Sequence, residues 1–127
     1  MNFIKKIYYQ KYSKKSYSIS NVDLIIDRLF RNNKKGIYLD IGCNHPIKHN
    51  NTYLLYKRGW NGINIDSDSK SIEEFRKLRE KDYNINSLIS SKKGKIKYYF
   101  YHARSALNTV DLELVKKRKA KPKKVIN

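Results

Sequence analysis

Cysteine, glycine, proline and acidic residues are all scarce in this chain of 127 residues. Its single cysteine, Cys43, excludes a disulfide framework and a zinc site built from several cysteines. No apolar run approaches the roughly 20 residues that a membrane-spanning helix needs. The basic N-terminus also lacks the apolar segment that would follow in a signal peptide. We therefore expect a cytoplasmic protein with no transmembrane segment and no metal site.

Positive charge dominates the composition, with 29 Lys and Arg against 11 Asp and Glu and a net charge of +18. Such a charge is typical of proteins that bind nucleic acid, anionic lipid or an acidic substrate. The abundant Lys, Ile, Asn and Tyr also share A/T-rich codons. Since the lysines are spread along the chain, codon bias is the favoured explanation. A hydrophobic content of 39% and the short length predict one small folded domain.

Three regions differ in composition. Residues 1–18 form a basic, Tyr-rich arm, residues 19–115 form the domain, and residues 116–127 form a basic tail. Alternating basic and aromatic residues in the arm could stack on nucleic acid bases. We favour the simpler interpretation, in which the Tyr rings pack on the surface of the domain.

The domain is expected to begin with an amphipathic helix. Ser20 and Asp23 have the spacing of a capping box at its start. An apolar stripe at helical spacing then predicts a face packed on the core. Its members are Val22, Ile25, Ile26, Leu29 and Phe30.

Strands and helices then alternate, which favours an α/β fold with parallel strands and right-handed crossovers. The predicted elements are a strand Ile37–Ile41 covered on both faces, a helix Tyr53–Arg58 capped by Asn51 and Thr52, a strand Asn61–Asp66, a helix Ser67–Glu80, a strand Tyr83–Ile89, a strand Lys95–Tyr101 and a helix capped by Thr109. The strand Lys95–Tyr101 alternates, with Ile96, Tyr98 and Phe100 opposite Lys97, Tyr99 and Tyr101, which predicts a half-exposed strand at the edge of the sheet. We thus expect three parallel strands plus an edge strand, with flanking helices.

Acidic residues lie near the carboxyl ends of the first two strands, where ligands of such sheets bind. Asp66 closes the second strand, and an acid there accepts hydrogen bonds from both hydroxyls of a ribose. Asp40 precedes a turn with one glycine, Gly42, and this combination disfavours phosphate. A neutral or cationic nucleoside such as S-adenosylmethionine fits better. The alternative is a pair of solvated strand-end carboxylates.

Several segments resemble the FkbM-type S-adenosylmethionine-dependent methyltransferases. They are YLDIGCNHP at 38–46, NTYLLYKRGWNGINID at 51–66, KDYNIN at 81–86 and ALNT at 106–109. The N-T-Y-x-x-Y-x-x-G-W pattern is the specific part of the match. The resemblance covers roughly residues 20 to 120. It implies a Rossmann-like methyltransferase fold with methyl transfer to a hydroxyl of a sugar, a glycan or another small metabolite.

The resemblance also implies individual residue roles. The turn residues would wrap the methionine end of the cofactor, Asp66 would hold the ribose, Asn86 would lie near the adenine, and a loop would lie beside the cofactor. The turn residues are Asp40, Gly42, Cys43 and Asn44, and the loop residues are Asn51 and Thr52.

No catalytic base is evident from the sequence. The histidines His45, His49 and His102 are the candidates, each more simply explained as a surface or loop-ordering residue. Cys43 is better explained as a small turn residue than as a nucleophile, because no partner base is identifiable.

The chain stops before the fourth strand of the family and its D-x-E-G-like motif. We therefore expect a truncated fold with half a cofactor site and no complete catalytic site. The strand Ile37–Ile41 would keep an unpaired edge, where a completing chain or a second copy could pair. The rival function is nucleic-acid binding by the basic residues between Lys116 and Lys124. The structural alternative for that tail is a solvated helix end and a frayed terminus.

Overall fold

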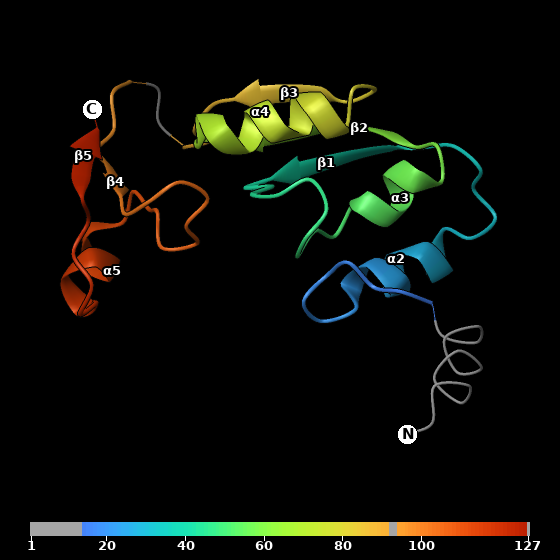
Figure 1. Cartoon of the computed structure of the whole chain (residues 1–127), viewed down its shortest axis with the longest axis horizontal. Helices are drawn as coiled ribbons and strands as arrows, with labels where there is room; N and C mark the ends of the chain where they lie inside the picture. The colour runs from blue at the N-terminus through green and yellow to red at the C-terminus, as the bar shows by residue number, and fades with distance from the viewer. Residues whose placement is uncertain (1–13, 92–93, 127) are drawn as a thin grey trace.

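The computed structural model describes residues 14–91 and 94–126. The elements in chain order are α2 (Val22–Leu29), β1 (Ile37–Ile41), α3 (Tyr53–Lys57), β2 (Asn61–Asp66), α4 (Ser69–Leu78), β3 (Tyr83–Asn86), β4 (Tyr98–Phe100), α5 (Leu112–Lys117) and β5 (Lys124–Ile126) (Figure 1). No helix in these two ranges is long and apolar enough to cross a bilayer. The predictions for residues 1–13 of the arm lie outside the described residues.

A parallel sheet with the order β1-β2-β3 forms the centre of the fold. Leu39 of β1 is aligned with Ile63 of β2, and Ile63 with Tyr83 of β3. The predicted α/β class with three parallel strands is confirmed. The carboxyl ends of all three strands point toward the group formed by β4, β5 and α5 (Figure 1).

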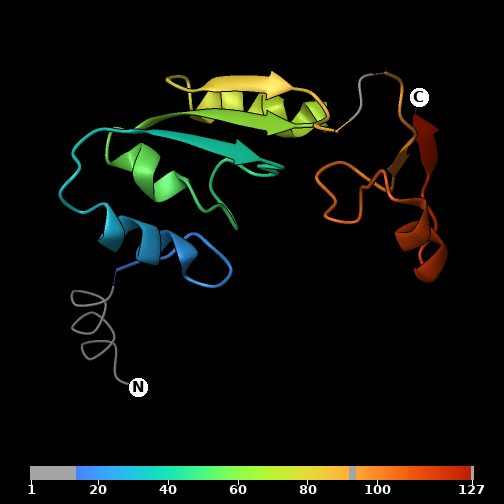
Figure 2. The ribbon, with the colours of Figure 1, turned by 180° about the vertical axis from the view of Figure 1, so that it is seen from behind.

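Helices α3 and α4 lie on the same side of the parallel sheet. The side chains beneath them include Tyr38, Asn64 and Asp82, all buried. Figure 2 shows the opposite side, and no described helix lies in front of it. We call this side the open face, defined by Ile37, Leu39, Ile41, Ile63, Ile65, Tyr83 and Ile85.

The prediction that β1 is covered on both faces is therefore wrong. Ile37 is 82% exposed and Leu39 is 58% exposed, although an apolar run normally marks a buried strand. Hydrophobicity indicates that burial would be favourable, but it does not supply the segment that would cover the strand.

Helix α2 also departs from the sequence prediction. Leu29 is 73% exposed and Ile25 is 58% exposed, so most of the predicted core stripe faces outward. The buried side carries two acids, Asp23 and Asp27. Asp27 is held there by ion pairs with Lys14 and Arg58, whose charges lower its pKa against the opposing effect of burial. The ion pairs of Asp27 therefore act together with two members of the stripe in setting the orientation of α2. Ile26 packs against the core, and the Phe30 ring lies edge-on to Trp60.

Asp23 anchors the segment that precedes α2. It accepts hydrogen bonds from Ser16 Oγ at 2.6 Å and from the Tyr17 amide at 2.7 Å. The predicted Ser20 cap is therefore wrong: the N-cap residue is Asn21, which makes no side-chain cap bond. The Tyr17 ring packs edge-on against Tyr53, with 4.7 Å between the ring centroids.

The strand predicted at Lys95–Tyr101 is shorter and lies in a different sheet. β4 pairs antiparallel with β5 in a separate two-stranded sheet, so the predicted edge strand of the parallel sheet is wrong. The buried side chains are Tyr99 and Tyr101, whereas Ile96 is exposed. Lys124–Ile126 form β5, so this part of the tail is not a frayed terminus.

Side-chain caps set the true starts of α4 and α5. Asp68 caps α4 by accepting from the Lys70 amide at 3.0 Å, and Asp111 caps α5 by accepting from the Glu113 amide at 2.8 Å. The predicted Thr109 cap is thus two residues early. At α3 the N-cap residue is Thr52, as predicted, but its side chain makes no cap bond. Asn50 Oδ1 instead accepts from the amides of Thr52 and Tyr53.

Candidate functional site

The turn after β1 and the end of β2 meet at the carboxyl edge of the sheet. Gly42 donates its amide to the Ile65 carbonyl at 2.8 Å. The Asn44 amide donates to Asp66 Oδ2 at 2.8 Å. Both Gly42 and Asn44 have a positive φ, of 71° and 53°. The left-handed turn therefore bends the chain back over β2, and it brings three of the predicted site residues together.

The Asp66 carboxylate has capacity to bind more than the backbone. Oδ2 accepts from Asn44, and Oδ1 accepts from the Asp68 amide at 2.8 Å. Each carboxylate oxygen has two lone pairs, so one remains on each. Asp66, Gly42 and Asn44 line a cavity of about 330 Å³, to which Arg104 and Asn108 also contribute. This arrangement is suited to a ligand with two adjacent hydroxyl groups.

Asp40 has a different environment from Asp66. Its Oδ2 accepts from Asn50 Nδ2 at 3.1 Å and from Thr52 Oγ1 at 2.8 Å. It does not line the cavity that Asp66 lines. Asp40 therefore orders the loop that follows the turn. The sequence placed Asp40 and Asp66 at the same edge, and the register of β1 and β2 agrees with that placement.

Arg79, which the sequence analysis missed, connects α4 to this loop. It is fully buried, and its guanidinium donates to the Pro46 carbonyl, Asn50 Oδ1 and Thr52 Oγ1 at 2.5 to 2.8 Å. It also lies 3.9 Å from the buried carboxylate of Asp82. Through Asn50 and Thr52, Arg79 fixes the groups that hold Asp40.

A sequence signal for Arg79 did exist. Ile72 and Phe75 are fully buried on α4, and Arg79 follows them at the i+7 and i+4 spacing of the same helical face. Leu78, three residues after Phe75, would extend the same apolar face by its type, but it is 50% exposed. A cation at a core position of the stripe is the pattern that would have identified Arg79.

Cys43 lies beneath the turn, packed with Ile72 and Phe75. Burial raises the pKa of its thiol, and the negative charges of Asp66 and Asp40 raise it further. The thiol therefore stays protonated at neutral pH and is a poor nucleophile. This agrees with its interpretation as a small turn residue.

Two predicted residues lie farther from the Asp66 carboxylate. The Asn86 side chain donates to the Asp66 backbone carbonyl at 2.9 Å and lines a second, larger cavity. Asn51 is exposed and lines neither cavity. The structure thus gathers Gly42, Asn44 and Asp66 around one cavity, with Asn86 beside it.

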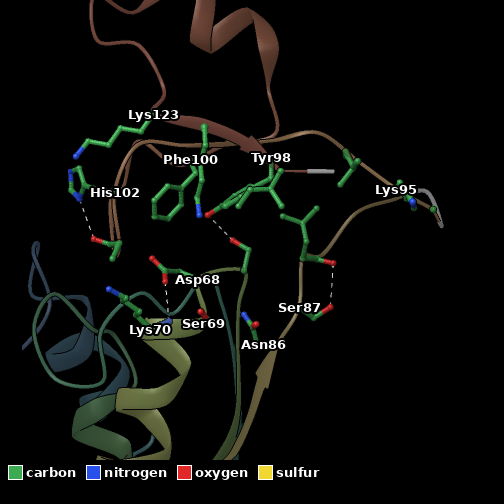
Figure 3. Close-up of a pocket in the computed structure, with 17 residues that line it drawn as sticks. Asp68, Ser69, Lys70, Asn86, Ser87, Lys95, Tyr98, Phe100, His102 and Lys123 are labelled. Atoms are coloured by element: carbon green, nitrogen blue, oxygen red, sulfur yellow. Dashed lines mark hydrogen bonds between the residues drawn. The ribbon is translucent and has the colours of Figure 1, made fainter.

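The larger cavity, of about 790 Å³, lies between the carboxyl edge of the parallel sheet and β4 (Figure 3). Tyr98 and Phe100 line one side, and Asp68 and Asn86 line the other. Ser67 Oγ donates to the Tyr98 hydroxyl at 2.9 Å, which links the two sides. Ser67, Asp68 and Tyr98 line both cavities, so the cavities adjoin.

The three histidines differ in their surroundings. His102 lines the larger cavity, with Nδ1 at 3.1 Å from the Ala103 carbonyl. Since a carbonyl only accepts, this contact places the proton on Nδ1 and leaves the Nε2 lone pair available. His49 is exposed and lines neither cavity. His45 Nδ1 accepts from the amides of Ile47 and Lys48, so His45 orders its loop.

The His45 contacts predict a pH dependence of stability. Burial lowers the pKa of His45, with Arg104 and Lys48 acting in the same direction and Glu74 opposing them. The unfolded chain then binds the proton more readily, so stability should fall as pH drops below about 6.5. We expect His45→Asn, whose Oδ1 accepts a local amide without titrating, to show a smaller loss in urea unfolding between pH 7.5 and 5.5. An equal loss in both proteins would contradict this prediction.

No family model matches the chain, and no curated protein or solved structure matches it either. Functional inference therefore depends on the chain's own residues and on the geometry of the two adjoining cavities.

Proposed function

We propose that this chain binds S-adenosylmethionine at the carboxyl edge of β1 and β2, as part of a methyltransferase of the FkbM type. The acceptor would be a hydroxyl of a sugar, a glycan or another small metabolite. The observation that carries the proposal is the Asp66 carboxylate, which keeps a lone pair on each oxygen and lines a cavity beside the left-handed turn at Gly42.

The residues around the smaller cavity fit the chemistry of this cofactor. Asp66 would accept hydrogen bonds from the two ribose hydroxyls. Gly42 has φ of 71°, and a Cβ placed on it would meet no atom within 4 Å, so the turn borders open space. Arg104 supplies a cation for a carboxylate, although Glu74 partly neutralises it at 2.6 Å. Asn86 would lie on the adenine side, next to the larger cavity.

When bound, S-adenosylmethionine supplies a methyl group activated by its sulfonium sulfur. The chain then has two tasks, which are to orient the acceptor and to accept its proton. The larger cavity adjoins the smaller one and is lined by Asn86, so it would hold the adenine. The acceptor would then approach from the side of the turn at Gly42 and Asn44, next to the methionine end of the cofactor.

Calorimetric titration with S-adenosylhomocysteine tests the proposal. We expect saturable binding to the wild-type chain and at least tenfold weaker binding to Asp66→Ala, because hydrogen bonds to a charged group contribute about 1.5–3 kcal/mol. Glu73→Ala, an exposed acid on α4, is the matched control and should bind normally.

A ligand-side comparison avoids any folding defect of the Asp66 variant. Adenosine should compete with S-adenosylhomocysteine for the wild-type chain, and 2′,3′-dideoxyadenosine should compete at least tenfold less well. Equal competition by the two nucleosides, or no heat of binding to the wild-type chain, would contradict the proposal.

Nucleic-acid binding is the second candidate function. The observation that favours it is the exposure of the tail lysines 116, 117, 119, 121, 123 and 124. Deleting the tail would also remove β5, so neutralising Lys119 and Lys121 with Gln is the cleaner test. If this function holds, a labelled oligouridine should bind more weakly to the double variant and more weakly at higher salt. Oligouridine binding that neither the double variant nor higher salt weakens would exclude nucleic-acid binding by the tail.

A further inference from the structure

The parallel sheet carries polar side chains on its covered face and apolar side chains on its open face, which is the reverse of the usual arrangement. Asn64 and Asn84 lie on the face covered by α4, where Asn64 is fully buried and donates to Asp82 and Asn84 at 2.9 and 2.8 Å. The open face carries only apolar side chains in two complete rows across the sheet. These rows are Leu39–Ile63–Tyr83 and Ile41–Ile65–Ile85.

The open face continues onto an unpaired strand edge. β1 is at the end of the sheet order, and among the described strands only β2 pairs with it. A strand edge beside a solvent-exposed apolar surface is a template for an added strand. The main-chain groups of β1 would bind the strand, and its alternate side chains would extend the apolar rows.

Charge argues against a second copy as the occupant. Each copy carries a net charge of +18, so two copies repel one another. A segment with acidic side chains would instead be attracted to the chain.

We infer that the free edge of β1 docks an extended polypeptide segment that adds a strand to β1, extends the apolar rows of the open face and carries acidic side chains at the end beside the start of β1. The acidic end follows from the charge at that point. Lys34 and Lys35 precede β1, and both are exposed. Asp66 lies on the covered face, so this surface is separate from the proposed cofactor site.

A designed peptide serves as the probe. Its centre alternates valine and threonine over eight residues, and two glutamates flank each end. We expect saturable binding to the full chain by fluorescence anisotropy, together with slower hydrogen exchange of the β1 amides. The same peptide with lysine flanks, and the acidic peptide with N-methyl groups on alternate residues, should each bind at least tenfold more weakly.

Two leucines provide matched variants for locating the binding surface. Leu39→Glu on the open face should weaken binding of the acidic peptide at least tenfold, whereas Leu29→Glu on the exposed side of α2 should leave it unchanged. Leu39→Thr introduces a β-branched residue suited to a strand and should also weaken binding, which guards against a folding defect in the Glu variant.

Three results would overturn the inference. One is equal binding of the acidic, lysine-flanked and N-methylated peptides. Another is sedimentation as a dimer that Leu39→Thr abolishes, which would assign the face to a second copy. The third is binding to phosphatidylglycerol vesicles that Leu39→Thr abolishes, which would assign the face to a membrane.

Discussion

Replacing Arg79 by methionine is expected to lower the free energy of unfolding by about 3–5 kcal/mol, the usual cost of removing one partner from a buried ionic network. The methionine side chain supplies no donor for the Pro46 carbonyl, Asn50 Oδ1 or Thr52 Oγ1, all of which Arg79 satisfies. Asp82 also loses its closest buried cation. Urea denaturation monitored by circular dichroism measures the change.

Arg76→Met is the matched control, because Arg76 lies on the same helix with an exposed side chain and one long contact of 3.5 Å to the Asn84 carbonyl. Its effect should stay within about 0.5 kcal/mol, as for most surface substitutions. If Arg79→Met costs no more than this control, Arg79 does not hold the loop that orders Asp40.

Replacing Gly62 by alanine is expected to cost about 3 kcal/mol, at the upper end for overpacking a core. A Cβ on Gly62 would lie 1.9 Å from Cε2 of Tyr38 and 2.1 Å from Cδ2. The Tyr38 ring has little freedom to move, because its hydroxyl donates to Asp82 and its ring packs with Leu55 and Trp60. Urea denaturation again provides the measurement.

A double-mutant cycle assigns this cost to the Tyr38 ring. In a Tyr38→Leu background, Gly62→Ala should cost less than about 1 kcal/mol, because the ring that it overlaps is gone. A cost that is the same in both backgrounds would show that the strain comes from the backbone of β2.

Local sequence patterns located most of the elements of the domain. The apolar run Ile37–Ile41 and the segment Asn61–Asp66, with its two isoleucines at alternate positions, predicted both strands with the observed bounds. Their alternation with helices gave the parallel pairing, because consecutive parallel strands need a crossover between them. The order of strands also placed Asp40 and Asp66 at one edge.

Nonlocal pairings were beyond the sequence patterns. Nothing in the alternation around Tyr98 indicates that its partner strand is Lys124–Ile126. Equally, the stripe on α2 predicts an apolar face but does not reveal that Lys14 and Arg58 would draw Asp27 inward. Such contacts join residues 13 and 31 positions apart in the chain, so no short window contains them.

The candidate site likewise combines residues that local sequence signals predict with residues that nonlocal contacts place. Asp66 and the turn at Gly42 followed from strand ends and glycine placement, which are local signals. The function of Asp40 as a loop anchor depends on Asn50 and on Arg79 from α4, whose burial is set by tertiary packing. The second cavity depends on β4, whose position next to the parallel sheet had no sequence signal.

The amide resonances of Asn44 and Asp68 provide the most direct test of the central claim, that the Asp66 carboxylate holds the ribose of the cofactor. Both amides donate to that carboxylate, so ribose hydroxyls binding to the same oxygens must alter their environment. In ¹⁵N–¹H spectra titrated with S-adenosylhomocysteine, we predict saturable shifts of these two amides and smaller shifts for the tail lysines. Shifts confined to residues 116–126, with Asn44 and Asp68 unmoved at saturation, would contradict the claim.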